Sequence, residues 1–366
     1  MFKKFLGFVL LAALVCACSC RRSSSSGGET GTRIVTDMVG RQVRVPAHIH
    51  RVLGMSPMGT ILVYTLDPSL LVGWNYPPAP GEKALILEPY RDLPVIGGWF
   101  GKDTTGNLEK IVQARPDVLI SMGDPLGTAQ AERVQAQTNI PVFVLTGGLD
   151  NFPAAYEKAG ELLGNAPRAA LLSGECRRAI EEIKQKVSGI PPEKRRRYYY
   201  AEGPKGQETE PGSPSHSESL NFAGGVNVAA GVELQQGYGH SPVSMEQVLR
   251  WNPEIVITGY DHASSPGEFY KAVWTDPRWR NVAAVRNREV YETPQYPFCW
   301  IDRPPSVNRI IGIKWLANLF YPELFQYDIR SETRHFYQTF YQVNLSEGQL
   351  DEILATAVRK PTGNAK

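Results

Sequence analysis

Two short segments bring charged, aromatic and imidazole side chains close together in the sequence. Trp300 and Arg303 lie in WIDRPP, and His216 lies in the polar segment GSPSHSE. An arginine presents a planar fork of donors that suits a carboxylate or an oxyanion, and tryptophan offers a flat wall to a ligand. A neutral imidazole can bind a metal, and a charged one can bind an oxyanion. The alternatives are a structural ion pair between Asp302 and Arg303 and a surface position for His216.

Other candidate ligand-binding residues follow segments that we predict to be strands. Ser56 opens a predicted helix, whose free N–H groups would suit an anion, although Ser56 could equally be only a helix cap. Trp99 and Phe100 lie between glycines, either as walls of a cleft or as core residues. The second half of the chain adds three more candidates, Tyr200, Glu202 and His262.

Short β-rich segments alternate with helical segments along the chain, which is typical of α/β layers with largely parallel sheets. Ligands in such folds bind beyond the carboxyl ends of the strands, where the candidates above lie. The predicted strands are 51–53, 71–73, 117–120, 142–145, 197–201, 254–258 and 289–291.

An internal repeat divides the chain. LEKIVQARPDVLI at 108–120 recurs as MEQVLRWNPEIVI at 245–257, each a short helix stopped before proline and followed by a buried strand. Between the copies, 167–188 reads as one helix of roughly 33 Å, with an apolar stripe formed by Leu172, Cys176, Ile180, Ile183 and Val187. We therefore predict two Rossmann-like α/β lobes with mainly parallel sheets, joined by a single long backbone helix, with the ligand cleft between the lobes.

The N-terminal segment MFKKFLGFVLLAALVCACSC has the basic start and short apolar run of a secretory signal. Val15 lies three residues before Cys18 and Ala17 directly before it, so Cys18 is the favoured lipidated residue. Two neighbouring cysteines fit less well, Cys16 and Cys20. The alternative is a plain signal peptide with incidental cysteines. An acylated cysteine would hold the protein at a membrane surface.

The predicted segments follow from these features. They are a signal peptide at 1–17, a flexible tether at 18–32, an N-terminal lobe at 33–165, the backbone helix at 166–190, a C-terminal lobe at 191–330, and a C-terminal helical extension and tail at 331–366. Cys176 and Cys299 could pair, but we expect free buried thiols. The formal charge of +2 gives no basis for nucleic-acid binding.

Longer stretches resemble a known family. Five segments are similar to the lipoprotein solute-binding proteins of ABC importers that have one helical backbone. These segments are RIVTDMVGRQVRVP, GGWFGKDTTGNLEKIVQARPDVLI, NFAGGVNVAA, SMEQVLRWNPEIVITG and WTDPRWRNVAAVRNREVY. That group handles ferric siderophores, haem, cobalamin and some oxyanions. Two further segments are most similar to a subgroup that includes molybdate and tungstate binders alongside proteins for iron complexes. They are YPFCWIDRPPSVNRIIGIKWL and YYYAEG.

The resemblance implies a monomer without a cofactor of its own, anchored by lipid to the periplasmic face or cell surface. It implies capture of a ferric siderophore, haem or cobalamin-like metal complex and delivery to a permease dimer. The alternative solute is molybdate or tungstate. The resemblance also implies that Glu109 and Glu246 dock onto arginines of the permease. The alternative is that both are solvated acids that complement a helix dipole.

No catalytic motif was found that would favour an enzyme. The sequence has no Gly-x-Ser-x-Gly, no His-Glu-x-x-His and no Walker loop. We therefore expect a binding protein; a tethered hydrolase and a structural surface lipoprotein are the alternatives from other classes.

Overall fold

The computed structural model describes residues 31–100, 104–123, 125–212, 214–233, 240–259 and 267–359. Each half of the chain forms a parallel sheet. The first has the order β3-β4-β5, from β3 (Val52–Gly54), β4 (Val118–Gly123) and β5 (Val142–Thr146). The second has the order β11-β10-β6-β8, from β6 (Arg197–Ala201), β8 (Val226–Asn227), β10 (Ile255–Thr258) and β11 (Val290–Glu292). The predicted α/β class and its two parallel sheets are confirmed.

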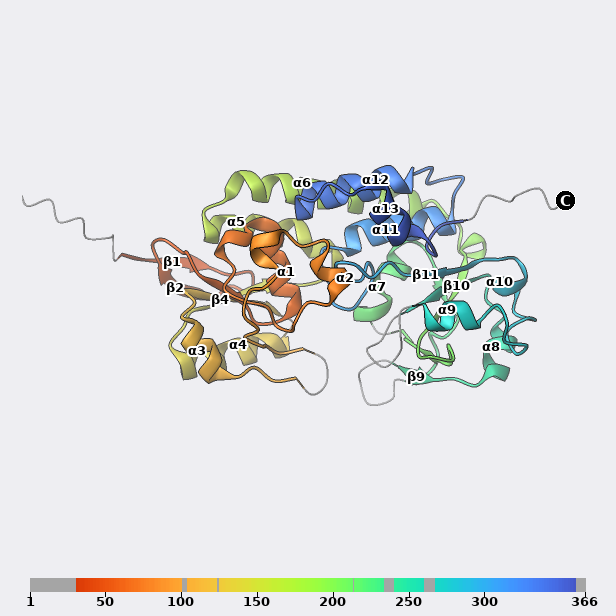
Figure 1. Ribbon diagram of the computed structural model, residues 1–366, viewed down its shortest axis with the longest axis horizontal. Helices are drawn as coiled ribbons and strands as arrows, with labels where there is room; N and C mark the ends of the chain where they lie inside the picture. The colour runs from red at the N-terminus through yellow and green to blue at the C-terminus, as the bar shows by residue number, and fades with distance from the viewer. Residues whose placement is uncertain are drawn as a thin grey trace, which may run out of the picture.

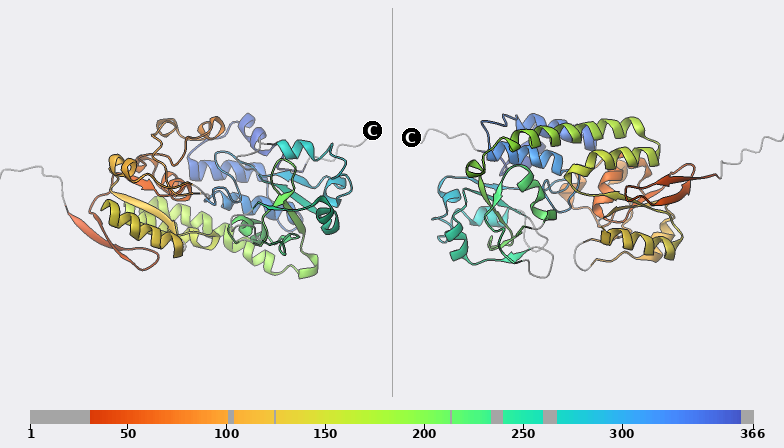
Figure 2. Two further views of the ribbon diagram at one scale, coloured as in Figure 1. Left: turned by 90° about the horizontal axis from the view of Figure 1, so that it is seen from below. Right: turned by 180° about the vertical axis from the view of Figure 1, so that it is seen from behind.

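Helices cover these sheets, as Figures 1 and 2 show. Those of the first half are α1 (Pro57–Leu66), α2 (Pro80–Lys83), α3 (Leu108–Ala114), α4 (Pro125–Thr138) and α5 (Phe152–Leu163). Those of the second half are α7 (Pro214–Phe222), α8 (Met245–Trp251), α9 (Glu268–Ala272) and α10 (Ala283–Arg286). Two antiparallel pairs add to this, β1 (Thr32–Thr36) with β2 (Gln42–Pro46) and β7 (Glu208–Thr209) with β9 (Ser241–Pro242).

The sequence repeat is also a structural repeat. Asn107 and Ser244 cap α3 and α8, each accepting a hydrogen bond from the backbone three residues on. Both helices end at a left-handed residue before proline, Arg115 with φ 47° and Asn252 with φ 43°. The same caps and the same ends show that the two halves are two copies of one unit.

Each copy also ties its helix to the first strand of its sheet through a matching arginine and carboxylate. Asp117 accepts from Arg51 N at 2.9 Å, and Glu254 accepts from Arg197 N at 2.8 Å. The same arginines donate from Nη2 to the last turns of the helices, at Ala114 O and Trp251 O. These contacts fix where each helix ends relative to the sheet.

The predicted backbone helix is confirmed as α6 (Ala166–Ser188), which runs along one side of both halves in Figure 1. All five residues of its predicted apolar stripe are buried. It packs closely on α5, where Ala169 lies against Gly160. A 23-residue helix that spans both halves limits how far they can move apart.

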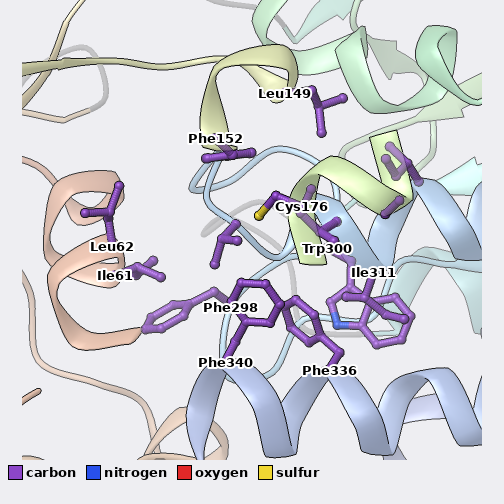
Figure 3. Packing of buried hydrophobic residues seen from close by; sticks show 14 of the residues in the cluster. Ile61, Leu62, Leu149, Phe152, Cys176, Phe298, Trp300, Ile311, Phe336 and Phe340 are labelled. Atoms are coloured by element: carbon purple, nitrogen blue, oxygen red, sulfur yellow. The ribbon is translucent and has the colours of Figure 1, made fainter. Parts of the chain in front are cut away.

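The C-terminal residues join the two halves a second time. They form α11 (Arg309–Phe320), α12 (Ile329–Phe336), a π-helical turn at Tyr337–Tyr341 and α13 (Glu347–Leu354). Rings of the π-helical turn reach the first half, with Tyr341 5.9 Å from Tyr64 and Phe340 6.2 Å from Tyr156 between centroids. Figure 3 shows Phe336 and Phe340 in one apolar core with Ile61, Leu62 and Cys176.

One arginine reinforces this second connection. Arg168 of α6 donates to Thr65 O at 3.1 Å and to Thr339 O at 2.5 Å.

Within the described part of the chain, no helix has both the length and the apolar character needed to cross a membrane.

Candidate functional site

A buried cluster of charges lies beyond the carboxyl ends of β6 and β7. Arg303 donates from Nη1 to Glu202 Oε1 at 2.7 Å and to Asp302 Oδ2, and from Nη2 to Glu210 Oε1. We call these four residues the Arg303 cluster. Glu202 follows β6 directly, and the bridge between Glu202 and Glu208 brings the start of β7 alongside it. The sequence places Glu210 two residues further on, so β7 brings it to Arg303.

The Arg303 cluster carries more negative than positive charge. Its three carboxylate side chains are at most 1% exposed, while the Arg303 side chain is 23% exposed. Burial alone would lower the pKa of Arg303, but Asp302 and Glu202 raise it well above its ordinary value. Burial would likewise raise the pKa of Asp302, but Arg303 and His216 together lower it. Asp302 and Arg303 are therefore both charged at neutral pH.

Two histidines border the Arg303 cluster. His216 on α7 places Nδ1 3.4 Å from Asp302 Oδ2. His240 has a left-handed backbone with φ 51° and places Nδ1 3.1 Å from Glu208 Oε2 and 3.9 Å from Glu202 Oε2. The cluster thus has imidazole groups on two sides.

Glu202, Glu210 and His240 could hold a metal ion. Each offers one ligand atom, and these atoms lie within 4.8 Å of one another. The second oxygen of Glu210, Oε2, is buried and has no hydrogen-bond partner among the described residues. Two carboxylates and an imidazole form a mixed oxygen and nitrogen donor set that suits first-row transition metal ions. The same surplus of carboxylates would repel an anion.

Tyr200 contacts the Arg303 cluster through Asp302. It is fully buried, and its hydroxyl donates to Asp302 Oδ1 at 3.1 Å. Burial, with Asp302 and Glu202 nearby, raises the pKa of Tyr200 well above its ordinary value, so the hydroxyl stays protonated. Tyr200 therefore orients Asp302 and has no exposed surface for a solute.

Trp300 lies in the core, away from any surface. Its side chain is fully buried, its Nε1 donates to Tyr337 Oη at 3.2 Å, and its ring meets Trp315 edge-on. Figure 3 shows it beside Ile311. Trp300 therefore packs in the core, while Arg303, three residues further on, belongs to the charged cluster.

Three predicted residues lie in the first half. Ser56 is the N-cap residue of α1 and is half-buried, but its side chain makes no cap hydrogen bond. Trp99 is half-buried, packs on the core of that half, and donates its backbone N–H to Met55 O at 2.8 Å. Phe100 is half-buried, with its ring 6.0 Å from that of Tyr76. No contact joins these three residues to the Arg303 cluster in the described residues.

The remaining predictions stand as follows. Glu109 and Glu246 are exposed near the starts of α3 and α8. Cys176 and Cys299 are free and buried, as expected. Cys18 and His262 lie outside the described residues.

The sequence interpretation did not single out Glu208 or Glu210, and it ranked His240 low. Glu208 and Glu210 occupy alternate positions in GQETEP, so an extended strand would point both to one side. That period-two pattern was the available signal. The approach of Glu210 to Arg303 depends on a tertiary contact between residues 93 positions apart, which no local pattern reveals.

Glu218 on α7 holds the two halves together beside the cluster. Its Oε1 accepts from Leu149 N of the first half at 3.0 Å, and its Oε2 accepts from Arg309 Nη1 at 2.6 Å. Arg309 also donates to Ile301 O, one residue before Asp302. A displacement of the first half can therefore reach the segment that carries Arg303.

Two hollows are found among the described residues, and neither borders the Arg303 cluster. A narrow one of about 20 Å³ lies between α11 and α12 beside Lys314 and His335. A broader one of about 470 Å³ lies beside α8, between Val232, Val243 and Trp251.

The structure has two repeated α/β units that are joined by one long helix. A charged cluster lies beyond the strand ends of one unit. Together these features define a two-lobed extracytoplasmic solute-binding protein. The chain belongs to the periplasmic binding protein family, whose pattern matches residues 99–297. It is the solute-binding component of an ABC importer.

Known structures and proteins agree with this assignment. The ABC transporter solute-binding protein of Sulfurospirillum deleyianum is 33% identical, covers 88% of this chain and 99% of its own, and superimposes with a TM-score of 0.81. The molybdate-binding protein MolA of Haemophilus influenzae is 24% identical over 89% of this chain and 95% of its own. A structure of MolA bound to molybdate covers 86% of this chain and 99% of its own at 23% identity, with a TM-score of 0.65, and shows the shared fold.

Proposed function

We propose that this chain captures a positively charged, metal-containing solute at the Arg303 cluster and delivers it to the permease of its importer. Such a solute could be a metal ion or a chelate that leaves coordination positions open. The ferric siderophore, haem and cobalamin-like complexes expected from the sequence fall in this class if their metal or cationic groups reach Glu202, Glu210 and His240.

The surplus of buried carboxylates carries the proposal. One guanidinium faces Glu202, Glu210 and Asp302, whose side chains are almost fully buried. Three buried carboxylates that share one guanidinium repel one another, so this arrangement gains free energy when a second cation arrives. The ligand atoms of Glu202, Glu210 and His240 are already gathered within 4.8 Å of one another.

Arg303 then acts as a resident counterion. It shares Glu202 and Glu210 with the candidate metal ligands, and its Nη1 and Nη2 already donate to them. An arriving cation competes with Arg303 for these two side chains. The guanidinium keeps the cluster folded before capture and retreats toward Asp302 as the cation binds.

A second candidate function is binding of molybdate or tungstate, which the 24% identical MolA favours. Under this alternative Arg303 would be the anion donor. Arg303 already donates to three carboxylates, and their surplus negative charge would still face the anion. The charge balance therefore favours the cationic solute.

Other residues extend the proposal. Ser56, Trp99 and Phe100 would contact the solute from the first half, and His216 and His262 would contact it from the second. Cys18 would carry the lipid anchor, and Glu109 and Glu246 would dock onto the permease.

Thermal unfolding of the purified protein tests the solute class. The panel contains Mn²⁺, Co²⁺, Ni²⁺, Zn²⁺, a ferric siderophore, haem, cobalamin, molybdate and tungstate. A ligand at 100 times its Kd stabilises by about 2.7 kcal/mol, which is a clear rise in Tm. We expect that rise with a metal cation or cationic chelate. A rise with molybdate or tungstate alone would contradict the proposal.

Glu210→Gln tests the site within the same assay. The substitution keeps the volume of the side chain but removes one anionic ligand, so we expect the affinity for the cation to fall by at least about tenfold. Glu193→Gln is the matched control, because Glu193 is exposed in the turn before β6, at the opposite strand end from the cluster. Equal affinities for both variants would show that the cation binds elsewhere.

A further inference from the structure

An exposed aliphatic side chain accompanies each of the two proposed docking glutamates. Val112 on α3 is 49% exposed, and Leu249 on α8 is 38% exposed. Each is the only exposed large hydrophobic residue within its copy of the described repeat, 108–120 and 245–257. Large aliphatic side chains at such exposure are ordinary when scattered, but these two hold the same repeat position.

The spacing puts each aliphatic residue on the same helix face as its glutamate. Val112 is three residues after Glu109, and Leu249 is three residues after Glu246, so the side chains are neighbours on the helix surface. Because α3 and α8 have matching caps and ends, each glutamate and its aliphatic neighbour occupy the same place on their helix. The molecule thus presents one acidic and apolar contact twice.

Both copies lie on one side of the molecule. Figure 1 shows α3 and α8 at the lower left and lower right, opposite α6, and the view from behind in Figure 2 agrees. A partner that touches both must therefore repeat its own contact, as a two-fold symmetric dimer does.

We infer that Val112 and Leu249 are apolar contacts to the two subunits of the importer's permease, each seated beside a basic residue that receives Glu109 or Glu246. This inference rests on the proposed docking role of the glutamates. The partner surface would offer, twice, a cationic side chain next to a shallow apolar depression. Charge would steer the encounter, and the desolvated aliphatic contact would prolong the complex.

The test measures binding of the purified protein to its cognate permease complex in lipid nanodiscs. Val112→Ser and Leu249→Ser should each weaken binding about fivefold, mainly through faster dissociation, because each removes an apolar contact. The fold-loss of affinity in the double variant should equal the product of the two single losses. The conservative variants Val112→Ile and Leu249→Met should bind like the wild type.

Leu171→Ser is the matched control, because Leu171 is 48% exposed on α6, at the opposite side of the molecule. It should leave binding unchanged. Wild-type binding by both serine variants, while Glu109→Gln and Glu246→Gln weaken it, would overturn this inference alone. Wild-type binding by the glutamate variants as well would overturn the docking role itself. Solute affinity should be the same in all these variants.

Discussion

At the scale of single residues, the identity of a side chain did not determine its role. Arg303 is a good oxyanion donor by type, and the sequence analysis interpreted it so. Its role in this fold depends on Glu202 and Glu210, which lie about 100 residues away and come to it through the sheet. Trp300 and Arg303 are three residues apart, yet one is in the core and the other in the cluster.

Glu82, a half-buried acid of the first half, gives a pH prediction. Burial raises its pKa to about 7, although Ala79 N and Tyr76 Oη donate to it and lower the pKa in part. Between pH 4.5 and 7 the unfolded chain loses this proton while the folded chain keeps it, so stability falls as pH rises. Glu82→Gln should remove that slope and raise stability at pH 8 by on the order of 2 kcal/mol.

Urea unfolding at pH 4.5, 6, 7 and 8 checks this prediction. Wild type and Glu82→Gln should have similar stabilities at pH 4.5 and should diverge as the pH rises. Parallel curves at all four pH values would show that Glu82 ionises normally in the folded protein.

At the scale of elements, local patterns were sufficient for most of the fold. Six of the seven predicted strands, the proline-stopped helices of the repeat and α6 are confirmed, and their periodicities depend on neighbouring residues. The predicted strand at 71–73 forms only an isolated bridge between Leu71 and Val52. The two antiparallel pairs were missed as elements, and β7 and β9 have two residues each, which is too short for a periodic signal. The packing of α11 against the segment before the cluster also has no local signature.

Gly312 in α11 tests that packing. A Cβ at this position would lie far inside contact distance of Trp300 O. Gly312→Ala should therefore destabilise by about 1–3 kcal/mol despite the better helix propensity of alanine. Gly348→Ala in α13 is the control, because nothing lies within 4 Å of its added Cβ, and it should be neutral or slightly stabilising. Urea midpoints that rank the two variants the other way would contradict this packing.

At the scale of the whole molecule, two connections hold the halves. One is α6, and the other is the C-terminal region. Arg168, Tyr341 and Phe340 tie that region to α6 and the first half, and Tyr337 ties it to Trp300 of the second half. The sequence predicted the first connection but assigned 331–366 as an appended extension. That assignment missed the contact of Tyr341 with α1, 277 residues away, and that of Phe340 with α5, 184 residues away. Two such connections leave little freedom for hinge motion.

We therefore expect solute binding to change the shape of the protein very little. Small-angle X-ray scattering with and without the bound solute should give nearly equal radii of gyration. Arg168→Ala removes the donor to Thr65 and Thr339 and should widen the difference between the two states. A large contraction of the wild type on binding would contradict the two-connection account.

Calorimetric titration of Arg303→Met tests the central claim most directly, with the stabilising cation from the panel and with molybdate. The account predicts that the variant without solute is less stable by about 3–5 kcal/mol, because three buried carboxylates lose their partner. The affinity of the variant for the cation should rise by about tenfold or more, because the competing guanidinium is gone. The affinity of Arg303→Lys should lie between those of the Arg303→Met variant and the wild type. A wild type that binds molybdate and an Arg303→Met variant that no longer does would contradict the account.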